Sequence, residues 1–379
     1  MFVWHYVTCD REAVYYCDGC SCGTACNNSD NKDDTKLKKK HGKNNHATNP
    51  VSIKCQKCRT PYFSRHYLDI YGSRTPLPRN ASCISSGNNN SNSNCNSVNK
   101  KPVVIFLTGG AWTIGYRMWG TLLGRALAPF GILVIVPDYR NFPSADISHM
   151  VKDVDESISW VFNHVEDYGG DRDNVVLVGQ SAGAHIGGVV VARKVLDWLC
   201  EEKKKLGWKV CHDGNFHVKS MMNLPPLLSP YRPNQIRGFI STSAPHNLVT
   251  MREVFQGHGL SSSAQRSIFG GKEYNEKNTR CEDADILERW SPFHLVEKCQ
   301  NEYKELVELI SLKNNKTVTG AIGIDIDAIF SSKHDDNVNT PCNVLLKDFF
   351  PKMCIIHGTS DKTVSLCFAV SVNTTYVMI

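Results

Sequence analysis

The stretch VVLVGQSAGAHIGG, residues 175–188, decides the fold because it places a serine between a strand pattern and a helix pattern. The run VVLV (175–178) is short and continuously apolar, which is typical of a strand covered on both faces of a sheet. Ser181 would then occupy the tight turn before a helix, where a serine is forced into a strained backbone conformation. Gly179 and Gly183 would let neighbouring backbone approach without a side-chain clash. An ordinary Gly-Ser turn is the alternative.

Apolar runs of the same kind recur along the chain. They are VVIFL (103–107), ILVIV (132–136), GFIS (238–241) and MCII (353–356). Between two of these runs, residues 144–166 carry apolar side chains spaced three and four apart, which predicts an amphipathic helix: Ile147, Val151, Val154, Ile158, Val161 and Val165. Repeated alternation of strand and helix predicts an α/β fold with a mostly parallel, doubly wound sheet.

The composition fits a soluble globular protein: 379 residues, 41% hydrophobic and 21% charged. Much of the net charge of +6 lies in the low-complexity run at 36–45, so we expect no nucleic-acid partner. No apolar stretch approaches the roughly 20 residues of a transmembrane helix. Sixteen cysteines without a recognisable signal peptide predict reduced thiols and a cytoplasmic location, with membrane-surface association left open. The sequence does not indicate the oligomeric state.

The chain divides by composition into two parts. Residues 1–50 are predicted to be a low-complexity, cysteine-containing N-terminal extension, and residues 51–379 a single α/β domain. Polar segments at about 84–101, 200–234 and 300–348 interrupt the strand–helix alternation and are predicted to be insertions.

Two cysteine pairs near the N-terminus have the ligand spacing of a structural zinc site. They are Cys17-x-x-Cys20 and Cys55-x-x-Cys58. A long low-complexity stretch separates the pairs, and further cysteines crowd the first of them. We therefore favour free thiols over zinc and predict no metal site.

A glycine-rich stretch, LTGGAWTIGYRMWG (107–120), directly follows the predicted strand at 103–107. Its small residues would leave the N–H groups of Gly109, Gly110 and Ala111 facing a cleft. The N–H of Ala182, at the start of the helix after Ser181, would complete a site for an oxyanion. A phosphate-binding turn is the alternative, but the stretch lacks the Walker lysine and the Gly-x-Gly-x-x-Gly pattern.

Five motifs in order resemble a known family. TGGAWTIGYRMWG (108–120), DYRNFP (138–143) and GQSAGAHI (179–186) resemble the prenylcysteine methylesterase-like branch of the α/β-hydrolase carboxylesterases. YLDIYG (67–72) resembles the early strand of that family, and FPKMCIIHGTSD (350–361) resembles its acid-bearing strand end. The resemblance implies an α/β-hydrolase fold with cap helices, which we expect within residues 247–298.

The resemblance also implies the roles of the site residues. Ser181 is the nucleophile and Asp361 the acid that orients the base; Gly109, Gly110 and Ala111 form the oxyanion loop. Asp361 fits physically as well, because it follows a core strand at the sheet edge where ligand sites of α/β folds form. Trp112, Tyr139 and His246 are candidate walls of the substrate pocket. No metal or organic cofactor is implied.

The general base is the missing part of this set. In the α/β-hydrolase fold the histidine follows the acid, but the eighteen residues after Asp361 contain no histidine. We predict His185 to be a packing residue and His357 to be structural, and we consider His246 as a substitute base. The preferred interpretation is that the chain is truncated after about Val364, so that the C-terminal helix and the last strand are missing.

These observations predict a serine carboxylesterase that hydrolyses small or lipid-like esters through an acyl-enzyme on Ser181. The alternative is a catalytically impaired pseudo-hydrolase or binding module, because no histidine follows Asp361. An acyl transferase or an amidase would use the same residues.

Overall fold

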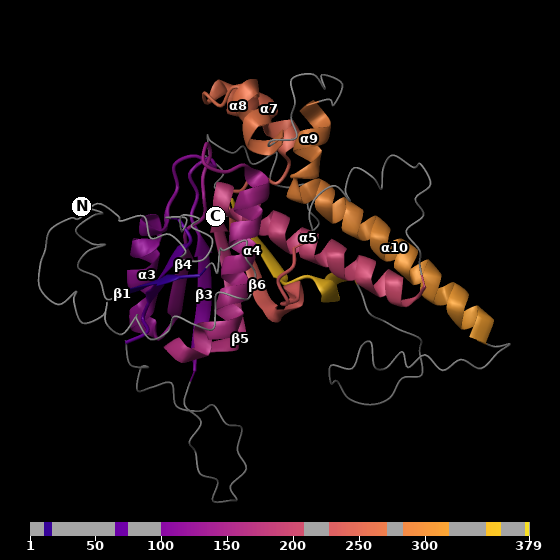
Figure 1. Cartoon of the computed structure of the whole chain (residues 1–379), viewed down its shortest axis with the longest axis horizontal. Coiled ribbons are helices and arrows are strands. Elements are labelled where there is room, and N and C mark those ends of the chain that lie inside the picture. The colour runs from indigo at the N-terminus through magenta and orange to yellow at the C-terminus, as the bar shows by residue number, and fades with distance from the viewer. Residues whose placement is uncertain are drawn as a thin grey trace, which may run out of the picture.

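The computed structural model describes residues 11–16, 65–74, 100–207, 227–270, 283–317, 346–357 and 376–378. Within these residues a single sheet lies between helices (Figure 1). Its strands are β1 (Arg11–Tyr15), β2 (Tyr67–Tyr71), β3 (Lys101–Leu107), β4 (Leu133–Pro137), β5 (Gly170–Gln180), β6 (Ile236–Thr242), β7 (Lys352–His357) and β8 (Tyr376–Met378). The α-helices are α3 (Thr121–Leu127), α4 (Ile147–His164), α5 (Ala182–Lys205), α7 (Leu248–Gly257), α8 (Ser262–Gly270), α9 (Asp283–Arg289) and α10 (Pro292–Thr317).

The eight strands follow the order β1-β2-β4-β3-β5-β6-β7-β8. β2 runs antiparallel to both β1 and β4, and every pair from β4 to β8 is parallel. A mostly parallel sheet with crossover helices and a serine turn after β5 is the arrangement of an α/β-hydrolase. The predicted fold class is confirmed.

The predicted apolar runs all form strands, because each run supplies side chains to both faces of the sheet. On one face Val103, Ile105 and Leu107 of β3 pack with α4 and α5 in the main core. On the opposite face Val134 and Val136 of β4 form a smaller core beside α3. The sheet is therefore covered on both faces where the site is built.

The predicted amphipathic helix is α4. Every member of the apolar stripe is buried, as the pattern predicts: Ile147, Val151, Val154, Ile158, Val161 and Val165. The helix begins after Asp146, whose carboxylate accepts a hydrogen bond from the N–H of His149 at 3.1 Å. This capping bond explains why the helix begins three residues later than the predicted range.

The prediction that the last strand is missing is wrong. Residues 376–378 form β8, which pairs in parallel with β7. Three residues are too few to show a pattern of their own, and their conformation is defined by the pairing with β7. The segment in which the C-terminal helix was sought, 358–375, lies outside the described residues, as does Asp361.

The sheet also begins earlier than the predicted domain boundary at residue 50. β1 lies at 11–15 and pairs with β2 along its whole length. The cysteine pairs at 17–20 and 55–58 lie outside the described residues.

Four α-helices follow β6 in the described part of the chain, and they begin within the region 247–298 where cap helices were predicted. α7, α8 and α9 lie together beyond one end of the strands, and α10 runs beside α5 (Figure 1). α10 includes the first part of the predicted insertion at 300–348 and is joined to α5 by ion pairs from Lys203 to Glu302 and Glu305. None of the described helices combines the length and the apolar character that crossing a membrane requires.

Candidate active site

Ser181 is the single residue between β5 and α5. Its backbone has φ 50° and ψ −120°, a conformation that L-residues rarely adopt. Two backbone bonds hold it there: the N–H of Ser181 donates to the Thr242 carbonyl at 2.8 Å, and the N–H of His185 donates to the Ser181 carbonyl at 2.9 Å. Such strain costs about 1–3 kcal/mol and persists only where the surroundings impose it. The predicted strand–turn–helix placement of Ser181 is confirmed.

Glycines on both sides of Ser181 allow the turn to lie against the neighbouring backbone. A Cβ at Gly179 would stand 2.4 Å from the Cα of Ala184. A Cβ at Gly183 would stand 2.4 Å from the carbonyl oxygen of Leu107. Both distances are far inside van der Waals contact, so only glycine fits, and α5 begins directly against the end of β3.

The loop after β3 lies beside Ser181. A Cβ built on Gly109 would be 3.1 Å from the Cβ of Ser181 and 3.0 Å from the carbonyl oxygen of Gln180. The backbone then turns through positive φ at Gly110 (130°) and Ala111 (48°). The structure therefore brings together the predicted nucleophile and the predicted oxyanion loop.

The first amide groups of this loop differ from the later ones in their bonding. Among the described residues, no backbone acceptor takes the N–H of Gly109, Gly110 or Ala111, whereas the N–H groups of Thr113 and Ile114 donate to the Gly110 carbonyl. The N–H of Ala182 belongs to the first turn of α5, where intrahelical partners are absent, and the helix dipole favours negative charge there. Together these groups can stabilise an oxyanion next to the Ser181 hydroxyl.

Trp112 does not present its indole to an open cleft. It is 2% exposed, and its Nε1 donates to Nδ1 of His185 at 3.2 Å. Its ring meets Phe255 of α7 and Phe269 of α8 edge to face, with centroids 5.5 and 5.1 Å apart. Trp112, which was predicted to be a pocket wall, thus packs between the oxyanion loop and the cap helices α7 and α8.

His185 cannot act as the base. Because its Nδ1 accepts from Trp112, its Nε2 carries the proton and donates to the Trp290 carbonyl at 2.8 Å. Burial lowers the pKa of His185 to about 3, so the ring is neutral. The ring bridges the oxyanion loop to the end of α9, in keeping with the predicted packing role.

His246 is also buried, and its ring is hydrogen-bonded to a neighbouring residue. Its Nε2 lies 3.1 Å from the hydroxyl of Ser241, and the side chain is 2% exposed. It lines a pocket between α5, α10 and β7 that none of the other predicted site residues lines. Burial, with a smaller contribution from nearby His357, lowers the pKa of His246 to about 4. The structure therefore does not support the expected place of His246 in the substrate pocket.

The two buried histidines predict that acid destabilises the fold. Their folded-state pKa values, about 3 for His185 and about 4 for His246, lie below the ordinary 6.5. As the pH falls below 6.5, the unfolded chain binds protons that the folded chain does not. Stability is therefore lost on acidification, by about 2 kcal/mol per histidine between pH 7 and pH 5.

Urea unfolding followed by circular dichroism at pH 7 and pH 5 measures this loss. His246→Gln should lose about 2 kcal/mol less stability over that interval than the wild type. His164→Gln serves as the control because His164 is exposed, and it should keep the full loss. An unchanged pH dependence in His246→Gln would contradict the assignment.

Tyr139 is likewise buried rather than pocket-facing. It is 1% exposed, and its hydroxyl donates to the carbonyl of Thr108 at 2.7 Å. The prediction of Tyr139 as a pocket wall did not include this bond, which joins residues far apart in the chain. The partners Asn141 and Arg65, which bind the same loop at Gly115, were missed for the same reason.

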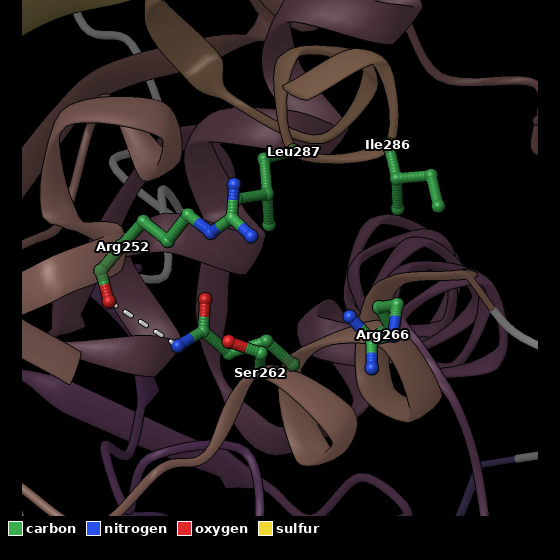
Figure 2. Close-up of a pocket in the computed structure, with 6 residues that line it drawn as sticks. Arg252, Ser262, Arg266, Ile286 and Leu287 are labelled. Atoms are coloured by element: carbon green, nitrogen blue, oxygen red, sulfur yellow. Dashed lines mark hydrogen bonds between the residues drawn. The ribbon is translucent and has the colours of Figure 1, made fainter. Parts of the chain in front are cut away.

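A separate pocket lies between the cap helices (Figure 2). It is lined by Arg252, Ser262, Gln265, Arg266, Ile286 and Leu287. The amide of Gln265 donates to the backbone carbonyl of Arg252 at 3.3 Å across one side of it. None of the predicted site residues lines this pocket. Across the described residues, no group of three or more potential metal ligands occurs.

Comparison with known proteins places these motifs in a family. Residues 93–303, more than half of the chain, match the family described as BD-FAE. The chain belongs to the BD-FAE family. The BD-FAE match includes both Ser181 and the oxyanion loop.

Individual relatives agree with the expected resemblance. An isoprenylcysteine alpha-carbonyl methylesterase of Arabidopsis thaliana is 38% identical over 177 residues, which cover 47% of this chain and 36% of that protein. Esterase LipQ of Mycobacterium tuberculosis is 36% identical over 88 residues, 23% of this chain and 21% of that protein. The chain spans about a third of the length of the curated relatives that it matches most extensively. A crystal structure of inhibited esterase B from Lactobacillus rhamnosis aligns with a TM-score of 0.46 at 15% identity, over 83% of this chain and 70% of that chain.

Proposed function

We propose that this chain is a carboxylic ester hydrolase that uses Ser181 as its nucleophile. The observation that carries the proposal is the strained serine at φ 50° beside a loop whose first amide groups, those of Gly109, Gly110 and Ala111, have no backbone acceptor in the described structure. Strained backbone is held in place where a side chain must be presented at a set point. Membership of the BD-FAE family and similarity to proteins named as methylesterases and esterases support the same reaction class.

The proposed mechanism has two steps. In the first, Ser181 Oγ attacks the ester carbonyl carbon, and the developing oxyanion is held by the N–H groups of Gly109, Gly110, Ala111 and Ala182. The C–O bond to the alcohol then breaks, the alcohol leaves with the proton that the Ser181 hydroxyl has lost, and an acyl group stays on Ser181. In the second step, water attacks the acyl-enzyme and releases the acid. Each aligned oxyanion donor contributes about 3 kcal/mol to the stabilisation of the transition state.

We propose an ester with a substantial apolar part as the substrate. Three large apolar side chains just beyond the oxyanion loop are exposed: Ile114, Trp119 and Leu122. Exposed large apolar side chains near a candidate site favour a surface that meets an apolar ligand. The relative in Arabidopsis thaliana is named for a methyl ester of isoprenylcysteine, and such a lipid-like ester is our preferred substrate class.

A second candidate is a protein that binds esters and acylates slowly, with little turnover. It is favoured by the state of His185 and His246, which are both buried, neutral and hydrogen-bonded to other groups. Without a base, a serine hydrolase keeps only about 10³–10⁴-fold acceleration over water.

Hydrolysis of a short-chain nitrophenyl ester tests the first proposal. Ser181→Ala should lower the rate at least about 1,000-fold, or to the level of buffer if the wild type is slow. Ser243→Ala is the matched control, because Ser243 also ends a strand of the same sheet with positive φ, 49°. Equal rates in wild type and Ser181→Ala would refute the nucleophile. A stoichiometric burst of nitrophenol without turnover would select the second candidate.

A further inference from the structure

The segment that follows β4 is bonded to the oxyanion loop along its length. Three hydrogen bonds join the two: Tyr139 Oη donates to Thr108 O at 2.7 Å, Asn141 Nδ2 to Gly115 O at 2.6 Å, and Phe142 N to Trp112 O at 2.9 Å. In each bond the loop supplies a carbonyl oxygen and the segment supplies the donor. Three carbonyls of the loop are thus held by this segment, and none of the three bonds uses an amide group of the loop.

The bond from Tyr139 bears on the Gly109 amide through the geometry of a single peptide unit. The carbonyl of Thr108 and the N–H of Gly109 lie in one plane and point in opposite directions, because the peptide is trans. Fixing the direction of the carbonyl therefore fixes the direction of the N–H. Gly109 is the loop residue whose backbone lies against the Cβ of Ser181.

The next amide of the loop is fixed locally instead. The carbonyl of Gly110 accepts from the N–H groups of Thr113 and Ile114 at 2.9 and 3.0 Å, which sets the direction of the Ala111 N–H. This turn closes within four residues and needs no distant partner. The carbonyl of Thr108, in contrast, accepts its hydrogen bond from the Tyr139 side chain, which is 31 residues away in the chain.

Tyr139 is itself held firmly. Its backbone carbonyl accepts from Nε of Arg65 at 3.2 Å, and the preceding carbonyl, that of Asp138, accepts from the hydroxyl of Tyr16 at 2.6 Å. Burial raises the pKa of Tyr139 above its ordinary value of 10, so the hydroxyl keeps its proton and donates throughout the working pH range. The donor is therefore fixed in both position and protonation state.

We infer that Tyr139 is a positioning residue, which aligns the Gly109 amide for the oxyanion by holding the Thr108 carbonyl. The inference rests on the proposed function, since it concerns the same site. It also gives a physical reason for a tyrosine in the DYRNFP motif: a phenylalanine would pack equally well but could not hold the carbonyl.

The reaction of the full chain with a fluorophosphonate measures this role, because the probe's phosphoryl oxygen uses the same amides. The probe forms a bond from Ser181 Oγ to phosphorus and releases fluoride. Tyr139→Phe should lower kinact about tenfold, less than the 100-fold or more that follows loss of a whole donor. KI should stay within about twofold, since the amides act mainly on the transition state.

Tyr71→Phe is the matched control. Tyr71 is also 1% exposed and its hydroxyl bonds Thr121 at 3.2 Å, away from the loop. The two variants should lose similar thermal stability, and only Tyr139→Phe should lose kinact. Equal kinact in both, at matched folding by circular dichroism, overturns the inference.

Asn141→Ala provides a second variant in the same segment. The Gly115 carbonyl keeps Arg65 as a donor when Asn141 is removed, so kinact should change less than about threefold. A loss as large as that expected for Tyr139→Phe would show that the segment acts as a whole and would overturn the assignment to the Tyr139 hydroxyl. A folded wild type that does not label at Ser181 would refute the proposed function and this inference together.

Discussion

Replacing Gly115 by alanine is expected to disrupt the oxyanion loop. A Cβ at this position would lie 1.7 Å from the carbonyl oxygen of Gly109 and 2.9 Å from its carbon. Both atoms belong to the main chain and cannot rotate away, so the loop between Gly109 and Gly115 has to move. We expect a loss of about 3 kcal/mol of stability, at the upper end for overpacking, and about 100-fold lower reactivity of Ser181.

Urea unfolding and the rate of probe labelling measure the two effects. Gly257→Ala is the control, since a Cβ there would meet nothing within 4 Å. It should change stability by no more than about 1 kcal/mol and leave labelling unchanged. If Gly115→Ala labels at the wild-type rate, the close contact with Gly109 does not set the geometry of the site.

Replacing Ser181 by glycine should abolish ester hydrolysis and stabilise the fold at the same time. Glycine adopts positive φ without the steric cost that serine has at φ 50°, and we expect about 1 kcal/mol of added stability after the entropy of the unfolded chain is counted. Ser181→Ala should be equally inactive but no more stable than the wild type, because alanine keeps the Cβ.

Ser243→Gly is the control that separates the effect of backbone strain on stability from the effect of the Ser181 hydroxyl on hydrolysis. Ser243 has φ 49° at the end of β6 and its N–H donates to the Ile356 carbonyl at 2.9 Å, so glycine there should add similar stability. Hydrolysis should be retained in this variant. Thermal unfolding and nitrophenyl ester turnover provide the comparison. A Ser181→Gly variant that is less stable than Ser181→Ala would contradict the claim that the turn is strained.

The fold could be predicted where local patterns carry the information. β3, β4, β5, β6 and β7 are apolar runs, and α4 has a stripe at helical spacing, so each shows its burial in its own sequence. β1 and β8 could not be recognised in this way. REAVY at 11–15 is a short, mixed edge strand and YVM at 376–378 has three residues, and each belongs to the sheet through its pairing partner.

The candidate site, like the fold, could be predicted only where a local sequence pattern carries the information. The turn at Ser181 and the loop at Gly109 follow from short motifs, because glycine spacing reports directly on backbone proximity. The orientation of the side chains of Trp112, Tyr139 and His246 does not follow from short motifs, because it depends on where each side chain finds a hydrogen-bond partner. The partner of Tyr139 is 31 residues away, and His185, which pairs with Trp112, also bonds a carbonyl 105 residues away. For these residues the sequence predicted a place near the site but not the direction of the side chains.

The most direct test of the account is the attachment site of a fluorophosphonate on the intact chain. The labelled protein is digested, and the modified peptide is identified by mass spectrometry. The account predicts one adduct, on the Ser181 hydroxyl, that is absent from Ser181→Ala and present in Ser243→Ala. A folded chain that carries no adduct, or carries it on another residue, would contradict the claim that the turn between β5 and α5 presents a reactive nucleophile.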